Sequence, residues 1–240
     1  MRQAYHLGLA QLDRESADMC IVADNCLRDA TRALLSADLA LAEQVIASVT
    51  LLAPFRGTAE YRVMELLTLQ AQVAADLRTV VAALWNVADL TRMGTLAGHV
   101  ARSARRRHPK AVVPPAVRPI IERMGRLAVH LADQTGLVLR DRDIALARAL
   151  DAQDVLLDDQ QRAMFAAVLA PSWSHGVEAA VDTALLSRFY ERFADHAVSV
   201  AGRVVFLVTG DHSSVLPAAA NSAVGPIRSF PTRPTGRAAT

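Results

Sequence analysis

Helical periodicity is the feature of this 240-residue sequence that most limits its fold. Apolar residues recur at steps of three and four over long windows, and no window of four or more residues alternates apolar with polar side chains. Such spacing is typical of amphipathic helices and argues against a sheet. Ala, Val and Leu supply most of the 52% hydrophobic share and aromatic residues only 5%, which favours helices packed through small and medium side chains. The sequence therefore predicts an all-α protein.

The pattern divides into six predicted helices, with ends good to about three residues. They cover about residues 4–35, 38–70, 73–107, 116–139, 143–169 and 177–209. In the second helix, Pro54 is followed closely by Gly57, so we expect a kink or break around Ala53–Gly57. After the third helix, the prolines of "RRHPKAVVPP" cannot donate to a helix ladder, which indicates a linker or tight crossover.

The two halves of the chain echo each other. "DLALA" (residues 38–42) recurs as "DIALA" (143–147), each just after a predicted helix end. "RMGTLAGHVA" (92–101) aligns with "RFADHAVSVA" (192–201), sharing Arg, Ala, Val and Ala at matching places. Both matches fall at the same place in a three-helix unit, which indicates an internal pseudo-repeat.

The repeat predicts a tandem pair of antiparallel three-helix bundles, because short connections make successive helices antiparallel. The first bundle is expected over residues 1–107 and the second over 116–210, with a linker at 108–115. Residues 211–240 are rich in Pro, Ser, Ala, Gly and Thr and have no periodicity, so we expect a disordered tail.

Two acidic pairs are the candidate site. Glu191 and Asp195 lie four apart in the sixth predicted helix, and Asp154 and Asp158 lie four apart in the fifth. The helical period places Glu191 and Asp195 nearly opposite the apolar stripe of their helix, on an outer or partner-facing surface. On consecutive antiparallel helices, the two pairs could converge into one oxygen-rich cation site. The alternative is a solvated acidic face balanced by arginines such as Arg188.

Charge and motifs narrow the function classes. The net charge is +2, and the basic run "RSARRRHPK" (102–110) has no interleaved aromatic residues, so we expect no nucleic-acid partner. This run could touch anionic lipid or an acidic partner, although cations also favour a helix C-terminus. The serine-hydrolase elbow, the phosphate-cradling glycine loop and the dinucleotide fingerprint are all absent, which predicts a protein that is not an enzyme. No secretory core or run of eighteen apolar residues occurs, so we expect a cytoplasmic protein.

The segments "SRFYERFADHAVSVA", "LQAQVAADLR" and "ADLALAEQVI" resemble the PhoU family of phosphate-uptake regulators, particularly its actinobacterial branch. The resemblance covers about residues 1–210, and "ERFADHAV" is its most specific element. It implies two three-helix bundles in a cytosolic protein that often forms a homodimer. It also implies a negative regulator of phosphate-starvation signalling that binds a sensor histidine kinase and the phosphate ABC transporter.

The resemblance further implies iron or zinc bound at acidic motifs, which here match Asp154 with Asp158 and Glu191 with Asp195. The first half departs from this pattern, because Thr91 stands where the family motif carries an acid, as does Thr95 four residues later. We therefore expect metal in the second bundle and none in the first. The alternatives are a helical metalloenzyme or metal-storage bundle that uses the same carboxylates, and a metal-free helical scaffold.

Overall fold

The computed structural model describes residues 2–69 and 74–210, and over these ranges it contains seven helical segments and no strand. They are α1 (Arg2–Ser36), α2 (Leu39–Val49), α3 (Leu52–Leu69), α4 (Ala74–Arg107), α5 (Arg118–Asp141), α6 (Ile144–Val168) and α7 (Gly176–Thr209). The all-α prediction is confirmed. The predicted disorder of residues 211–240 concerns a segment outside the described residues.

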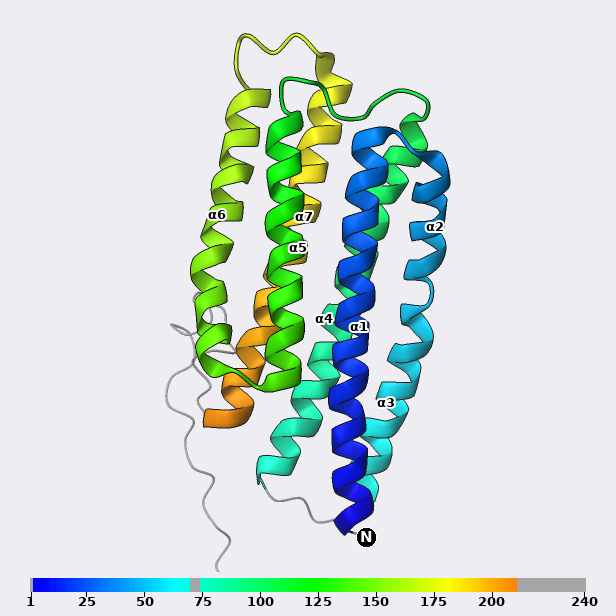
Figure 1. The fold of residues 1–240 in the computed structure, drawn as a ribbon, viewed down its shortest axis with the longest axis vertical. Coiled ribbons are helices and arrows are strands. Elements are labelled where there is room, and N and C mark those ends of the chain that lie inside the picture. The colour runs from blue at the N-terminus through cyan, green and yellow to red at the C-terminus, as the bar shows by residue number, and fades with distance from the viewer. Residues whose placement is uncertain (1, 70–73, 211–240) are drawn as a thin grey trace, which may run out of the picture.

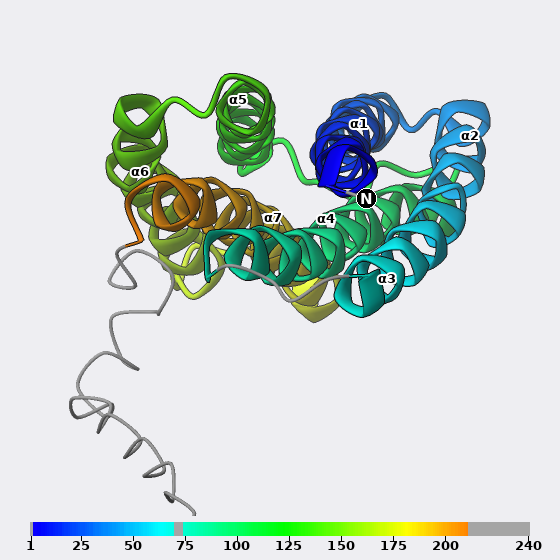
Figure 2. The ribbon, with the colours of Figure 1, turned by 90° about the horizontal axis from the view of Figure 1, so that it is seen from below.

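The helices form two antiparallel three-helix bundles that lie side by side (Figure 1). One bundle contains α1, α4 and the α2–α3 pair, and the other contains α5, α6 and α7. Seen end-on, α1 and α5 lie on one side and α4 and α7 on the other, with α2–α3 and α6 at the outer edges (Figure 2). Because α1 contacts α5 and α4 contacts α7, one hydrophobic core runs through both bundles. The tandem arrangement is confirmed, and the exact division at residues 108–115 stays a prediction.

The internal repeat is visible in the backbone at two helix junctions. Ala37 and Arg142 both adopt left-handed conformations, with φ of 52° and 53°. The next residues, Asp38 and Asp143, are extended and cap α2 and α6, each accepting a hydrogen bond from the backbone N–H three residues on, at 3.0 and 2.9 Å. Such caps satisfy an N–H group that the first helical turn leaves unpaired. The "DLALA" and "DIALA" echo therefore marks equivalent helix starts.

The break in the second predicted helix lies earlier than expected. The structure divides this region at Thr50 and Leu51, upstream of the predicted Ala53–Gly57 kink, and α3 continues through both Pro54 and Gly57. Pro54 is the third residue of α3 and so lies in the first turn, where a backbone N–H would have no intrahelical partner and its absence loses nothing. A proline there costs little and starts a helix instead of breaking one.

The α2–α3 edge carries an apolar surface. Among the described residues, Leu39–Thr68 is the one stretch long and apolar enough to span a membrane, and only 17% of its most apolar window is buried in the protein. In the structure this stretch is two helices that lie along α1 and α4. Tyr61 and Met64 are 74% and 61% exposed, and Leu67 is also exposed one helical step further along. Residues spaced in this way are neighbours on one helix surface.

Candidate acidic site on the second bundle

The two predicted acidic pairs lie on neighbouring helices. Asp154 and Asp158 belong to α6, and Glu191 and Asp195 belong to α7, which packs along α6. The buried side chains of Leu157 and Phe193 fix the two helices against the core and so hold the acids in register. The helical period alone left it open whether the two pairs face each other, and the structure brings them together.

Electrostatics show this convergence most clearly at Asp154. Its half-buried carboxyl has a pKa raised from 3.8 to about 7. Loss of water around the group is the largest cause, and the negative charges of Asp195, Asp158 and Glu191 add to it in that order. One oxygen of this carboxyl, Oδ1, is buried without a hydrogen-bond partner. The site therefore favours a proton or another positive charge at Asp154 near neutral pH.

Glu191 corrects the predicted orientation. It was expected on the outer surface, but it is only 8% exposed. The physical reason is that α7 contacts three helices, α4, α5 and α6, so its buried face is wider than a single apolar stripe. Arg188 donates a hydrogen bond to Glu191 Oε1, while Oε2 is buried without a partner. Burial, followed by the charge of Asp195, raises the pKa of Glu191, and Arg188 opposes this shift.

Asp195 lies at the solvent-facing side of the group. Loss of water raises its pKa, Arg188 lowers it, and Asp158 raises it. Within residues 2–69 and 74–210, no three His, Cys, Asp or Glu side chains are grouped closely enough to hold a metal ion as they stand. The acids are thus close enough to interact electrostatically, but their carboxylates do not converge on one position. A cation would have to draw the side chains inward by rotamer changes.

The matching positions of the first bundle have a different chemistry. The hydroxyls of Thr91 and Thr95 donate to backbone oxygens one turn back in α4, at 2.7 and 3.0 Å. Asp89, the acid left on this segment, accepts hydrogen bonds from Arg203 and shares one of 2.8 Å with His196 Nδ1. These contacts join α4 to α7, so Asp89 ties the two bundles together.

The basic run at the end of α4 is also used within the fold. Arg106 donates to Asp182 at 3.0 Å, and Arg107 donates to the other oxygen of the same carboxylate at 2.7 Å. Asp182 is only 6% exposed and belongs to α7. Much of the positive charge that suggested a lipid or acidic partner therefore pairs across the two bundles.

A residue that the sequence analysis passed over is Gln153. Its side-chain Oε1 is buried without a hydrogen-bond partner, next to Asp154 in the chain. A search for charged pairs ignores amides, although an amide oxygen is an ordinary ligand for hard cations. The signal available in the sequence was only its place within "DAQDVLLDD".

Comparison with known proteins places these features in one family. The PhoU domain model matches the chain twice, over residues 17–104 and 121–204, one match in each bundle. The phosphate-specific transport system accessory protein PhoU homolog 2 of Mycobacterium tuberculosis is 48% identical over 210 residues, covering 88% of this chain and 99% of that protein. Homolog 1 of Mycobacterium leprae is 47% identical, covering 88% and 95%.

Solved structures agree at the level of the fold. The crystal structure of PhoU from Pseudomonas aeruginosa superposes with a TM-score of 0.79 at 22% identity, covering 86% of this chain and all of that one. PhoU from Streptococcus pneumoniae gives a TM-score of 0.77 at 21% identity. The two domain matches agree with the mycobacterial relatives, which are similar over nearly their full length, and with the shared fold. This chain is therefore a member of the PhoU family.

Proposed function

We propose that this chain is a cytoplasmic accessory protein of a phosphate-specific transport system and a negative regulator of phosphate-starvation signalling. The single observation that carries the proposal is the similarity to mycobacterial accessory proteins over nearly their whole length. The protein acts by binding a sensor histidine kinase and the phosphate ABC transporter, without covalent chemistry of its own. A homodimer belongs to the same proposal.

The apolar edge of α3 is a suitable surface for these contacts. Tyr61, Met64 and Leu67 are exposed neighbours on one helix face, and contiguous exposed apolar groups typically mark protein–protein contact sites. Helix α6 lies at the opposite edge from α3 (Figure 1), and the acidic group belongs to α6 and the neighbouring α7. The two edges therefore offer chemically distinct surfaces to different partners.

The acidic group is the part of the chain that would hold the metal that the family implies. Asp154, Asp158, Glu191 and Asp195 would hold iron or zinc, because two of their carboxyl oxygens are buried without partners. Neighbouring negative charges also raise the pKa of Asp154, Glu191 and Asp195, and Arg188 opposes this only at the last two. An all-oxygen ligand set suits hard, highly charged cations, which favours iron over zinc. Such a cation would neutralise the acids and clamp α6 to α7. Thr91 and Thr95 leave the first bundle without matching ligands.

Deletion of the gene, with a reporter for a phosphate-starvation promoter, tests the regulatory role. Loss of this protein should switch the reporter on in phosphate-rich medium, and the wild-type gene should switch it off again. A Tyr61→Asp, Met64→Asp double variant should fail to restore repression, whereas Tyr61→Phe should restore it. A reporter that stays off after deletion would contradict the proposal. Metal-dependent turnover of a phosphoester or redox substrate, abolished by Glu191→Ala, would point instead to a metalloenzyme.

A further inference from the structure

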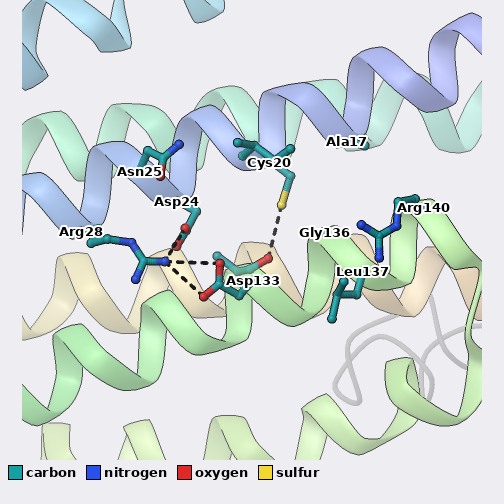
Figure 3. Close-up of a pocket in the computed structure, with 11 residues that line it drawn as sticks. Ala17, Cys20, Asp24, Asn25, Arg28, Asp133, Gly136, Leu137 and Arg140 are labelled. Atoms are coloured by element: carbon teal, nitrogen blue, oxygen red, sulfur yellow. Dashed lines mark hydrogen bonds and ion pairs between the residues drawn. The ribbon is translucent and has the colours of Figure 1, made fainter.

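A groove between the two bundles is a second candidate site, separate from the acidic group. It lies between α1 and α5 and encloses a cavity of about 360 Å³, within the range of roughly 300–1,000 Å³ typical of small-molecule sites. Figure 3 shows Asp24 and Arg28 of α1 facing Asp133 of α5 across the groove, with Arg140 towards the other end. A ligand here would contact both halves of the protein.

The charges in the groove are not balanced by the chain itself. Arg28 donates to Asp24 at 2.8 Å and to Asp133 at 3.1 Å, so one guanidinium serves two carboxylates. Arg140 donates both of its bonds to Asp141, at 2.9 and 3.0 Å, and so contributes no cation to this pair. One negative charge is therefore left over at the centre of the groove.

The position of that charge is set by Asp24. This residue is only 5% exposed, and its Oδ1 has no hydrogen-bond partner. A buried carboxylate oxygen without a donor is costly, and a cationic N–H group is the partner that relieves the cost most fully. An anion is disfavoured, because both arginines that line the groove already bind carboxylates. The missing component is a donor that carries positive charge.

The walls of the groove suit an aliphatic chain attached to such a cationic donor. Ala17, Ile21 and Leu137 contribute aliphatic side chains, and Gly136 leaves its side of α5 open. The remaining reactive group, the Cys20 thiol, donates to Ala132 O at 3.5 Å, and burial raises its pKa to about 12. At neutral pH this thiol is not a nucleophile, so the groove is a binding site and not a reaction site.

We propose that the α1–α5 groove binds a small organic cation, an alkylammonium or alkylguanidinium compound, whose N–H donors contact Asp24 and Asp133 while its carbon chain lies along the aliphatic wall. This site does not depend on the regulatory role proposed above. A bound cation would connect α1 of one bundle to α5 of the other. It would therefore stabilise the arrangement of the two halves.

Isothermal titration calorimetry of the full chain at pH 7.5 with n-butylammonium tests this site. We expect saturable 1:1 binding that Asp24→Asn weakens by about 10- to 100-fold, the usual loss for a hydrogen bond to a charged group. Asp18→Asn is the matched control, since Asp18 is an exposed acid of α1 that does not line the groove. Tetramethylammonium, which has no N–H donor, and n-butanol, which has no charge, should bind much more weakly.

A second variant blocks the groove without touching its charges. A Cβ added at Gly136 meets only Cys20 Sγ, at an ordinary 4.0 Å, so Gly136→Leu should fold and fill the cavity. It should abolish butylammonium binding while the circular dichroism spectrum stays unchanged. No saturable binding to the wild type at millimolar butylammonium would overturn the proposal, as a proton alone would then satisfy Asp24. Equal binding by Asp24→Asn, or equal binding of tetramethylammonium, would overturn it as well.

Discussion

Replacing Asp154 by Asn tests the electrostatics of the acidic group directly. The pKa of Asp154 is raised from 3.8 to about 7, so the folded chain binds a proton there more tightly than the unfolded chain. Tighter proton binding stabilises the folded chain. This stabilisation is complete below pH 3.8 and is lost as the pH rises through 7. At pH 8 the ionised group costs the folded state up to about 4 kcal/mol, and side-chain relaxation and solvent reduce this to roughly 1–3 kcal/mol.

Asp154→Asn removes that cost, so in a chelating buffer at pH 8 the variant should be more stable than the wild type. The gain of roughly 1–3 kcal/mol corresponds to a Tm increase of about 2–4 °C per kcal/mol for a chain of this size. At pH 4 most of the advantage should vanish, because the wild-type carboxyl is then protonated. Thermal melts of both proteins across this pH range measure the effect.

Asp159→Asn is the matched control, because Asp159 is an exposed acid of the same helix that pairs with Arg162. Its effect should stay within about 1 kcal/mol and show no comparable pH dependence. If the acidic group binds metal, excess iron should raise the Tm of the wild type and leave that of Asp154→Asn nearly unchanged, which would reduce or reverse the difference between them. A variant less stable than the wild type at pH 8 without metal, or a gain that persists at pH 4, would refute the reasoning.

Four further variants test the fold and the groove. Asp38→Ala and Asp143→Ala should each cost about 1 kcal/mol in urea unfolding, since they remove equivalent caps, and strongly unequal losses would argue against the repeat. Tyr190→Phe removes a 2.9 Å hydrogen bond to Thr31 that joins α7 to α1. Urea unfolding should show a loss of stability of about 0.5–1.5 kcal/mol, and an unchanged stability would contradict the role of this bond in joining the two helices. Burial raises the pKa of Asp24 from 3.8 to about 6. In thermal melts without amine, Asp24→Asn should therefore be more stable than the wild type by up to about 3 kcal/mol at pH 7.5 and by little at pH 4. An equal effect at both pH values would exclude this origin.

Much of the fold was predictable because local periodicity determines it. Each predicted helix start and end after the linker lies within about two residues of the observed one, since caps such as Asp143 and Gly210 act locally. Pro54 misled the prediction because a proline breaks a helix interior but suits a first turn, and the sequence does not show which turn it occupies.

The grouping of the candidate acids was predictable only in part, and their role as metal ligands stays a prediction. Spacing identified all four acids, yet it placed Glu191 outside, because one apolar stripe does not describe a helix packed against three others. The contact between His196 and Asp89 spans 107 residues and depends on how the two bundles dock. The same holds for Asp24 and Asp133 in the groove, which no local pattern links.

Direct binding tests the central claim that this protein regulates by contact. Biolayer interferometry with the immobilised full chain should show saturable binding to the cytoplasmic part of the phosphate-sensing kinase and to the ATP-hydrolysing subunit of the phosphate transporter. Tyr61→Asp together with Met64→Asp should weaken at least one of these interactions, while Tyr61→Phe leaves both intact. Absence of binding to either partner, in phosphate-containing and phosphate-free buffer alike, would contradict the account.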